Sequence, residues 1–154
     1  MIQLVHAARP VSDLDRAREF YVDGLGMEHR WGFEEDGVEH IYVGDEGVAD
    51  IHLFYDPEND EPIDAGGNDG INDDTSVCLL VDEDLEGLFE DLGEETNCRV
   101  VLAPKEVEFE SHRNVICFVE DPDGHLVELI ERLEGPPPSA TGENADSDAG
   151  GTGE

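Results

Sequence analysis

Positively charged residues are scarce in this 154-residue chain. It has 8 Lys+Arg against 41 Asp+Glu, and its formal net charge is −33. Proteins that bind nucleic acids or anionic membrane surfaces hold phosphates with clusters of cations, so this composition excludes both kinds of partner. Only Lys105 is a lysine among these cations. This bias is typical of proteins from extreme halophiles, whose molar salt shortens the Debye length to roughly 3 Å.

Long apolar runs, paired cysteine motifs and nucleotide-binding motifs are missing as well. No segment approaches the about 18 apolar residues of a membrane span, and no signal peptide opens the chain, so we expect a soluble cytoplasmic protein. Three cysteines have no CxxC spacing, and Cys78 and Cys117 lie in apolar runs where a free thiol behaves as a small core residue. GxSxG, phosphate-loop and GxGxxG motifs do not occur, so serine hydrolysis and nucleotide binding have no support.

The apolar residues that are present, 38% of the chain, form strand-length and helix-length clusters that predict one domain over residues 1–133. Residues 134–154 have no large apolar side chain and no cation, which predicts a disordered acidic tail. Within the domain the order strand, helix, three strands occurs twice. The expected elements are 2–9, 13–22, 27–33, 39–43 and 49–55, then 76–81, 82–92, 99–102, 114–119 and 125–131. Two such βαβββ modules, about 2–56 and 75–132, predict an α+β fold of paired half-barrels around a cavity.

Four polar residues occupy equivalent strand positions in the repeat: His6, His52, Ser76 and Glu128. Glu128 lies in HLVELI, which is apolar on both faces of the strand. A buried carboxylate without a partner costs several kcal/mol, so it needs a cation, a metal or strong donors. With few basic residues available, a metal is favoured, and the alternative is an edge strand with Glu128 in water. Two histidines and one carboxylate suit Ni, Co, Mn, Fe or Zn and leave coordination positions open.

The other four histidines are weaker candidates. His29 and His40 have charged neighbours and are expected in solvent, and His112 is expected at the surface. His125 is odd in register with Glu128 and should face away from it.

Two long motifs carry a family resemblance. HAARPVSDLDRAREFYVDGLGM and VICFVEDPDGHLVELIE closely resemble the opening and closing motifs of the vicinal oxygen chelate superfamily, in particular its glyoxalase I (lactoylglutathione lyase) branch. The resemblance spans about residues 3–132 and implies paired modules around a divalent metal. It assigns His6 as the first ligand and Glu128 as the last ligand, which in the family is also linked to proton transfer. His52 stands where the family has Glu, and Ser76 where it has His.

The resemblance also implies a reaction and a thiol partner. The hemithioacetal of methylglyoxal and a small thiol is isomerised to a lactoyl thioester, with Glu128 moving the carbon-bound proton through an enediolate. Arg9 matches an arginine that contacts the carboxylate of the thiol cofactor, whereas Asp56 replaces an asparagine used in the same task. Because several of these families share sites across a dimer, we expect a homodimer.

Three alternatives stay open within the same superfamily. Extradiol Fe(II) dioxygenases use two histidines and one glutamate, and epimerases acting on acyl thioesters use the same base chemistry. A metal-free binding protein like the bleomycin-resistance proteins is favoured by Ser76 at a ligand position and disfavoured by the retention of Glu128.

Overall fold

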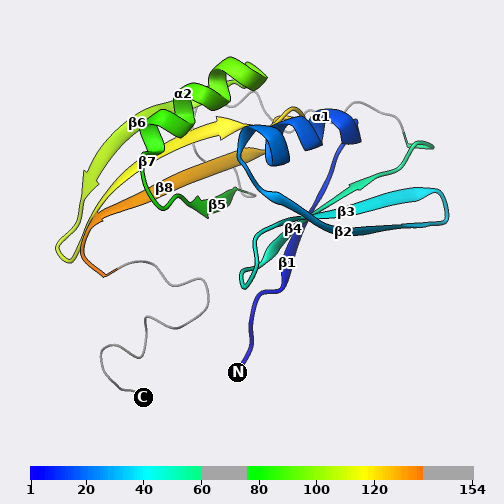
Figure 1. Cartoon of the computed structure of the whole chain (residues 1–154), viewed down its shortest axis with the longest axis horizontal. Coiled ribbons are helices and arrows are strands. Elements are labelled where there is room, and N and C mark those ends of the chain that lie inside the picture. Colours follow the sequence, from blue (N-terminus) through cyan, green and yellow to red (C-terminus); the bar gives the residue numbers. More distant parts are fainter. Residues whose placement is uncertain (60–75, 137–154) are drawn as a thin grey trace.

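The first half of the chain folds into a four-stranded mixed sheet with one helical segment. In the computed structural model, which describes residues 1–59 and 76–136, β1 (His6–Pro10) leads into α1 (Leu14–Arg18) and the π-helical turn η1 (Glu19–Gly24). Three strands follow: β2 (Glu28–Glu35), β3 (Val38–Gly44) and β4 (Asp50–Tyr55). The strand order is β1-β4-β3-β2, with β1 parallel to β4 and the other pairs antiparallel (Figure 1).

The second half repeats this arrangement. Its elements are β5 (Val77–Leu80), α2 (Leu85–Thr96), β6 (Val100–Glu108), β7 (Arg113–Glu120) and β8 (Leu126–Glu134), with the sheet order β5-β8-β7-β6. Ala8 lies opposite His52 on the parallel pair of the first sheet, and Cys78 lies opposite Glu128 on that of the second. These pairs match the alignment of the two halves predicted from the sequence, so the paired-module α+β fold is confirmed.

Local sequence explains where the first helical segment begins and how it ends. The Asp13 side chain caps α1 by accepting a hydrogen bond from the backbone N–H of Arg16 at 3.1 Å. The segment then widens, since the N–H of Leu25 reaches back five residues to the carbonyl of Phe20 at 2.9 Å. This wide turn lets the adjacent aromatic residues Phe20 and Tyr21 both enter the core.

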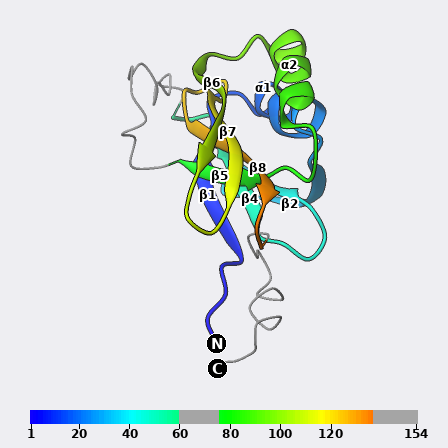
Figure 2. The same ribbon diagram turned by 90° about the vertical axis from the view of Figure 1, so that its left-hand side faces the viewer.

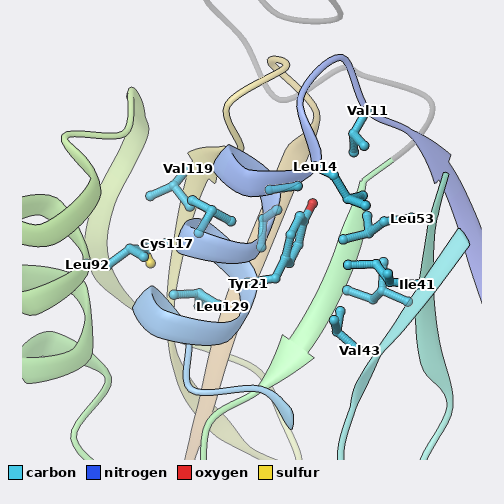
Figure 3. Close-up of a cluster of buried hydrophobic side chains, with 14 of the residues drawn as sticks. Val11, Leu14, Tyr21, Ile41, Val43, Leu53, Leu92, Cys117, Val119 and Leu129 are labelled. Atoms are coloured by element: carbon cyan, nitrogen blue, oxygen red, sulfur yellow. The ribbon is translucent and has the colours of Figure 1, made fainter. Parts of the chain in front are cut away.

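One hydrophobic core joins the two modules through the helical segments. Ile41, Val43 and Leu53 of the first sheet and Val119 and Leu129 of the second belong to the same buried cluster. Figure 3 shows Tyr21, carried by the helical segment, between these two groups of side chains. The two helical segments lie side by side at one end of the molecule, as Figures 1 and 2 both show. Each sheet therefore packs only one of its faces against this core.

The opposite face of each sheet is open. Alternation along β3 and β4 places His40, Tyr42, His52 and Phe54 away from the core, and cross-strand pairing adds Trp31 and Phe33 of β2. We call this group, together with His6, the first open face. Trp31 remains 51% exposed and Phe33 39% exposed. The second open face carries Cys78, Leu80, Phe118 and Glu128, of which Leu80 is 45% exposed.

Several expected boundaries differ from the structure. The first strand begins at His6, and residues 1–5 are exposed rather than part of the sheet. β6 continues to Glu108, well beyond the expected end, with irregular register around Leu102 and Lys105. Cys117 is buried as predicted, but Cys78 is exposed on the second open face and is not a core residue. Most of the expected tail, and residues 60–75, lie outside the described residues.

Within the described ranges, no helix has the length and apolarity that crossing a membrane requires.

Candidate functional site

The two histidines predicted as metal ligands lie together on the first open face. His6 opens β1 and His52 lies on the neighbouring strand β4, and their ring centroids are 5.5 Å apart with the planes nearly perpendicular. Tyr42 stacks on His52 at 4.3 Å and meets the His6 ring edge-on at 5.2 Å. Strand pairing and aromatic contacts thus hold both imidazoles on one surface.

A third histidine, His40 on β3, belongs to the same group. Its Nδ1 lies 2.8 Å from Nε2 of His52, and Phe33 stacks on its ring at 4.3 Å. The expectation that His40 is simply solvated was wrong, because the side chain is half-buried and engaged. The alternation of Ile41 and Val43 with His40 and Tyr42 contained this signal, since it places His40 on the face away from the core.

The surroundings of His52 favour its neutral form. Burial lowers the pKa of His52, and the neighbouring imidazoles of His40 and then His6 lower it further. A neutral imidazole has a free nitrogen lone pair, which is the form that binds metals. This is the protonation state in which the His52 ring could act as a metal ligand.

Glu128, the third predicted ligand, lies on the second open face. It is half-buried on β8, between Phe118 of β7 and Cys78 of β5. Although Cys78 as a residue is exposed, the atoms packed around its sulfur desolvate the thiol and raise its pKa to about 12, and the charge of Glu128 and a hydrogen bond to its carboxylate raise it further. The expected fully buried carboxylate is thus partly open to solvent, and a protonated thiol is its neighbour.

The predicted ligands do not all converge in one protomer. Residues 1–59 and 76–136 contain no group of three or more His, Cys, Asp or Glu side chains placed to hold one metal ion. His6 and His52 share a sheet, whereas Glu128 lies on the other sheet. Ser76, at the fourth equivalent position, lies exposed just before β5 begins.

Arg9, predicted to contact a thiol's carboxylate, points to the other face of β1. It is only 4% exposed, and its guanidinium donates hydrogen bonds to the Leu126 carbonyl at 3.0 Å and to the Tyr21 hydroxyl at 3.3 Å. A contact with a ligand on the first open face would require the side chain to leave these partners. The substrate-binding role of Arg9 stays a prediction, and the structure gives it a role at the junction between the modules.

The turn before β8 is part of this junction. One carboxylate oxygen of Asp121 accepts hydrogen bonds from the backbone N–H groups of Asp123 and His125, each at 2.9 Å. Its other oxygen accepts from the Tyr21 hydroxyl at 2.7 Å. Asp123 binds Ser12, and the His125 ring lies 2.9 Å from the carbonyl of Pro10. The DPDGH motif therefore attaches the second module to the first.

The Tyr21 hydroxyl stays protonated in this network. Burial raises the pKa of Tyr21 well above its ordinary value, and the charge of Asp121 raises it further.

A polar hollow of about 330 Å³ lies beside the same turn, lined in part by Arg16, Cys98 and Arg99. It contains none of the predicted site residues, so this hollow is separate from both open faces.

Comparison with known proteins agrees with this architecture. Residues 3–129 match the model of the Glyoxalase/Bleomycin resistance protein/Dioxygenase superfamily. The chain is 30% identical over 139 residues to a lactoylglutathione lyase of Haemophilus influenzae, covering 84% of this chain and 93% of that protein. It is also 30% identical over 142 residues to a lactoylglutathione lyase of Oryza sativa subsp. japonica, where it covers 88% of itself and 45% of the relative.

Solved structures show the same fold. Glyoxalase I from Zea mays superposes with a TM-score of 0.64 at 26% identity, over 87% of this chain and 46% of the maize chain. A trypanothione-dependent glyoxalase I from Leishmania major gives a TM-score of 0.62 at 22% identity, over 85% of this chain and 87% of that chain. The chain thus spans about half the length of the plant relatives and nearly all of the bacterial one. It belongs to the glyoxalase/bleomycin resistance protein/dioxygenase superfamily.

Proposed function

We propose that this protein is a metal-dependent lyase of the glyoxalase I type, which isomerises the hemithioacetal of methylglyoxal and a small thiol to a lactoyl thioester. The observation that carries the proposal is the pair of imidazoles, His6 and His52, on one open face, at repeat positions equivalent to Ser76 and Glu128 on the other module. The similarity to two lactoylglutathione lyases supports the same reaction class.

The donor set fits a divalent first-row metal such as Ni, Co, Mn, Fe or Zn. The pKa of His52 is lowered, so a neutral imidazole faces the open surface, and Glu128 adds a hard oxygen donor. When bound, the cation would polarise the two neighbouring oxygens of the hemithioacetal and make its C–H bond more acidic.

Glu128 is the proposed base. Its carboxylate would accept the proton from the thiol-bearing carbon and return it to the adjacent carbon, while the hydroxyl proton of the thiol-bearing carbon passes to the neighbouring carbonyl oxygen, so the hemithioacetal becomes the thioester with no atom gained or lost. Glu128 lies half-buried on β8 opposite Phe118 of β7, on the face where a substrate would bind. Trp31 and Phe33 add an apolar surface that would exclude water from the substrate.

A second copy of the chain would complete the site. His6 and His52 lie on the first sheet and Glu128 on the second, and no three donors gather within the described part of one protomer. Both open faces expose apolar side chains, including Trp31 and Leu80, which a partner would cover. We therefore propose a homodimer in which the first open face of one protomer meets the second open face of its partner.

Complementation between two inactive variants tests the shared site. His52→Ala and Glu128→Gln chains carrying different affinity tags are co-expressed, and the doubly tagged heterodimer is purified in molar KCl. One of its two sites then has only wild-type residues, so we expect about half the wild-type turnover per dimer. A His52→Ala dimer carrying both tags is the matched control and should be inactive. A heterodimer as inactive as this control would exclude a site shared in this way.

The reaction itself is tested by metal reconstitution. The protein is loaded with Ni, Co, Mn, Fe or Zn and assayed for lactoyl-thioester formation from methylglyoxal and several thiols, with oxygen uptake on catechols measured in parallel. We expect thioester formation, and Glu128→Gln should lower turnover more than it lowers metal retention. Oxygen uptake without thioester formation would favour the Fe(II) dioxygenase alternative, and failure of every metal to bind would contradict an enzymatic role.

A further inference from the structure

Asp50, the first residue of β4, carries a buried acceptor that the proposed mechanism does not use. Its Oδ1 has almost no contact with solvent and no hydrogen-bond partner among the residues that the structure describes. Asp50 lies on the same side of the sheet as His52, because Ile51 between them points into the core. A buried carboxylate oxygen without a donor costs free energy, so we expect a neighbouring N–H group to serve it.

Arg30 of β2 is the first candidate for this donor. Its Nε lies 3.9 Å from Oδ1 of Asp50, which is too long for a hydrogen bond. The same guanidinium donates from NH1 to Glu28 at 3.2 Å on its own strand. Arg30 therefore adds a favourable charge near Asp50 but leaves the acceptor unsatisfied.

His6 is the second candidate. It is the direct partner of Asp50 on the parallel pair β1 and β4, and neighbouring strands lie only about 4.8 Å apart. The His6 ring leans over β4, since its centroid is 5.5 Å from that of His52 and 5.2 Å from that of Tyr42 on β3. Gly44 leaves the room that the carboxylate fills, because a Cβ there would lie 2.5 Å from Oδ1. The acceptor and the imidazole thus occupy adjacent places on one side of the sheet.

We infer that Asp50 is a positioning residue for His6, whose ring donates Nδ1–H to Oδ1 after a rotation about its Cβ–Cγ bond. A short aspartate on the neighbouring strand reaches the ring nitrogen nearer the backbone, which is Nδ1. This hydrogen bond fixes the tautomer and leaves the Nε2 lone pair directed away from the sheet. The inference rests on the proposed function only for what that lone pair then binds.

The tautomer of His6 tests this assignment without metal, substrate or enzyme activity. Full-length protein with ¹⁵N-labelled imidazoles is measured by long-range ¹H–¹⁵N NMR in molar KCl at about pH 8.5, where an ordinary histidine is neutral. The His6 signals are identified by their loss in His6→Gln. We expect mainly the Nδ1–H tautomer, whereas a free imidazole in water favours Nε2–H.

Two variants of Asp50 separate hydrogen bonding from packing. Asp50→Leu removes the acceptor and should return His6 to mainly Nε2–H. Asp50→Asn keeps an acceptor oxygen and should retain more of the Nδ1–H form than Asp50→Leu does. The Nε2–H tautomer in the wild type would overturn the inference without any Asp50 variant, as would equal tautomer fractions in the wild type and Asp50→Leu.

The neighbouring ion pair supplies the matched controls. Glu28→Gln removes a carboxylate from the same sheet, and Arg30→Gln removes the rival donor; both should leave His6 in the Nδ1–H form. If either variant shifts the tautomer as far as Asp50→Leu does, the cause is the local charge and not a hydrogen bond from His6, and the inference fails.

Lyase assays on the same samples keep this result distinct from the proposed function. In an active enzyme, Asp50→Leu should lower turnover about 10–100-fold, with Asp50→Asn between it and the wild type. An active enzyme with His6 in the Nε2–H form would overturn the inference and leave the function standing. An Nδ1–H tautomer that is lost in Asp50→Leu, in a protein without lyase activity, would support the inference and contradict the function.

Discussion

Removing the Tyr21 hydroxyl tests whether the junction between the two modules holds the fold together. Tyr21 is fully buried, and its hydroxyl donates to Asp121 at 2.7 Å while accepting from Arg9 at 3.3 Å. Asp121 and Arg9 are each 4% exposed, so solvent has little access to replace the lost partner. Tyr21→Phe keeps the ring, and with it the edge contact to Phe20 at 4.9 Å, and removes only the oxygen.

The expected loss follows from the charge of the acceptor. A hydrogen bond to a charged group contributes about 1.5–3 kcal/mol, and the short bond to Asp121 falls in this class. The longer hydrogen bond from Arg9 contributes a free energy at the lower end of this range. In the variant Asp121 still accepts two backbone hydrogen bonds from the DPDGH turn on its other oxygen, which limits the loss. We therefore expect Tyr21→Phe to lower the free energy of unfolding by about 2–3 kcal/mol, a large share of the about 5–15 kcal/mol typical of a domain.

Urea unfolding at fixed protein and KCl concentration measures the difference. Tyr55→Phe is the matched control, because Tyr55 is half-buried on β4 and its hydroxyl makes no hydrogen bond within the described residues. It should change stability by less than about 0.5 kcal/mol. If the two variants lose equal stability, the hydroxyl network does not hold the modules together and the reasoning fails.

The pH dependence supplies a second check on the same residue. The folded state raises the pKa of Tyr21 above its ordinary value, so the folded protein holds this proton more tightly than the unfolded chain does. The stabilisation by Tyr21 is thus fully present below about pH 10 and is lost as the pH rises from there towards the folded pKa. The difference between wild type and Tyr21→Phe should shrink in alkaline urea titrations, and an unchanged difference would argue against this cause.

Three further measurements probe packing, the second open face and the charge. Gly24→Ala should destabilise the protein by about 1–3 kcal/mol, because a Cβ there would lie 2.7 Å from a Leu92 methyl group. Gly93→Ala in α2 should instead stabilise the protein by about 0.5–1 kcal/mol, because a Cβ at Gly93 would meet nothing within 4 Å. Thermal unfolding measures both variants, and melting temperatures that shift in the same direction would contradict the packing argument. Glu128→Gln should speed the alkylation of Cys78 by iodoacetamide at pH 8 several-fold, because the charge of Glu128 raises the pKa of the thiol. Peptide mass spectrometry measures the rate of alkylation, and equal rates in the variant and the wild type would exclude that coupling. Raising KCl from about 0.1 M to 1 M should increase the free energy of unfolding, because salt screens a net charge of −33, and a decrease would contradict the halophilic interpretation.

Periodicity and repetition were enough to predict the architecture. Alternation in β4 places Ile51 and Leu53 in the core and His52 outside it, and the same period orients Glu128 on β8. The pairing of Ala8 with His52 and of Cys78 with Glu128 follows from aligning the two halves of the sequence. This alternation of apolar and polar residues can be read from the sequence because each strand buries only one of its two faces.

Relations between elements were harder to predict. Arg9 lies three residues from His6, an odd spacing that puts it on the core face, yet a family motif suggested contact with a ligand. The charged neighbours of His40 in the sequence predict a solvated side chain, whereas its position is fixed by pairing with Phe54 across the hairpin. The apolar neighbours on both sides of Cys78 predict a core residue, whereas the side chain lies exposed on the second open face. In each case the deciding contact comes from a distant part of the chain, which composition around the residue does not report.

If two protomers share the site as proposed, with the histidines on one sheet and the acid on the partner's other sheet, the amount of assembled site depends on protein concentration by mass action. Specific activity should then fall when the enzyme is diluted below the dissociation constant of the dimer, and substrate or metal that bridges the two sheets should shift this midpoint to lower protein concentration. Rates measured at nanomolar enzyme would understate an intact catalyst, whereas a tandem fusion of two copies would keep its activity at any dilution.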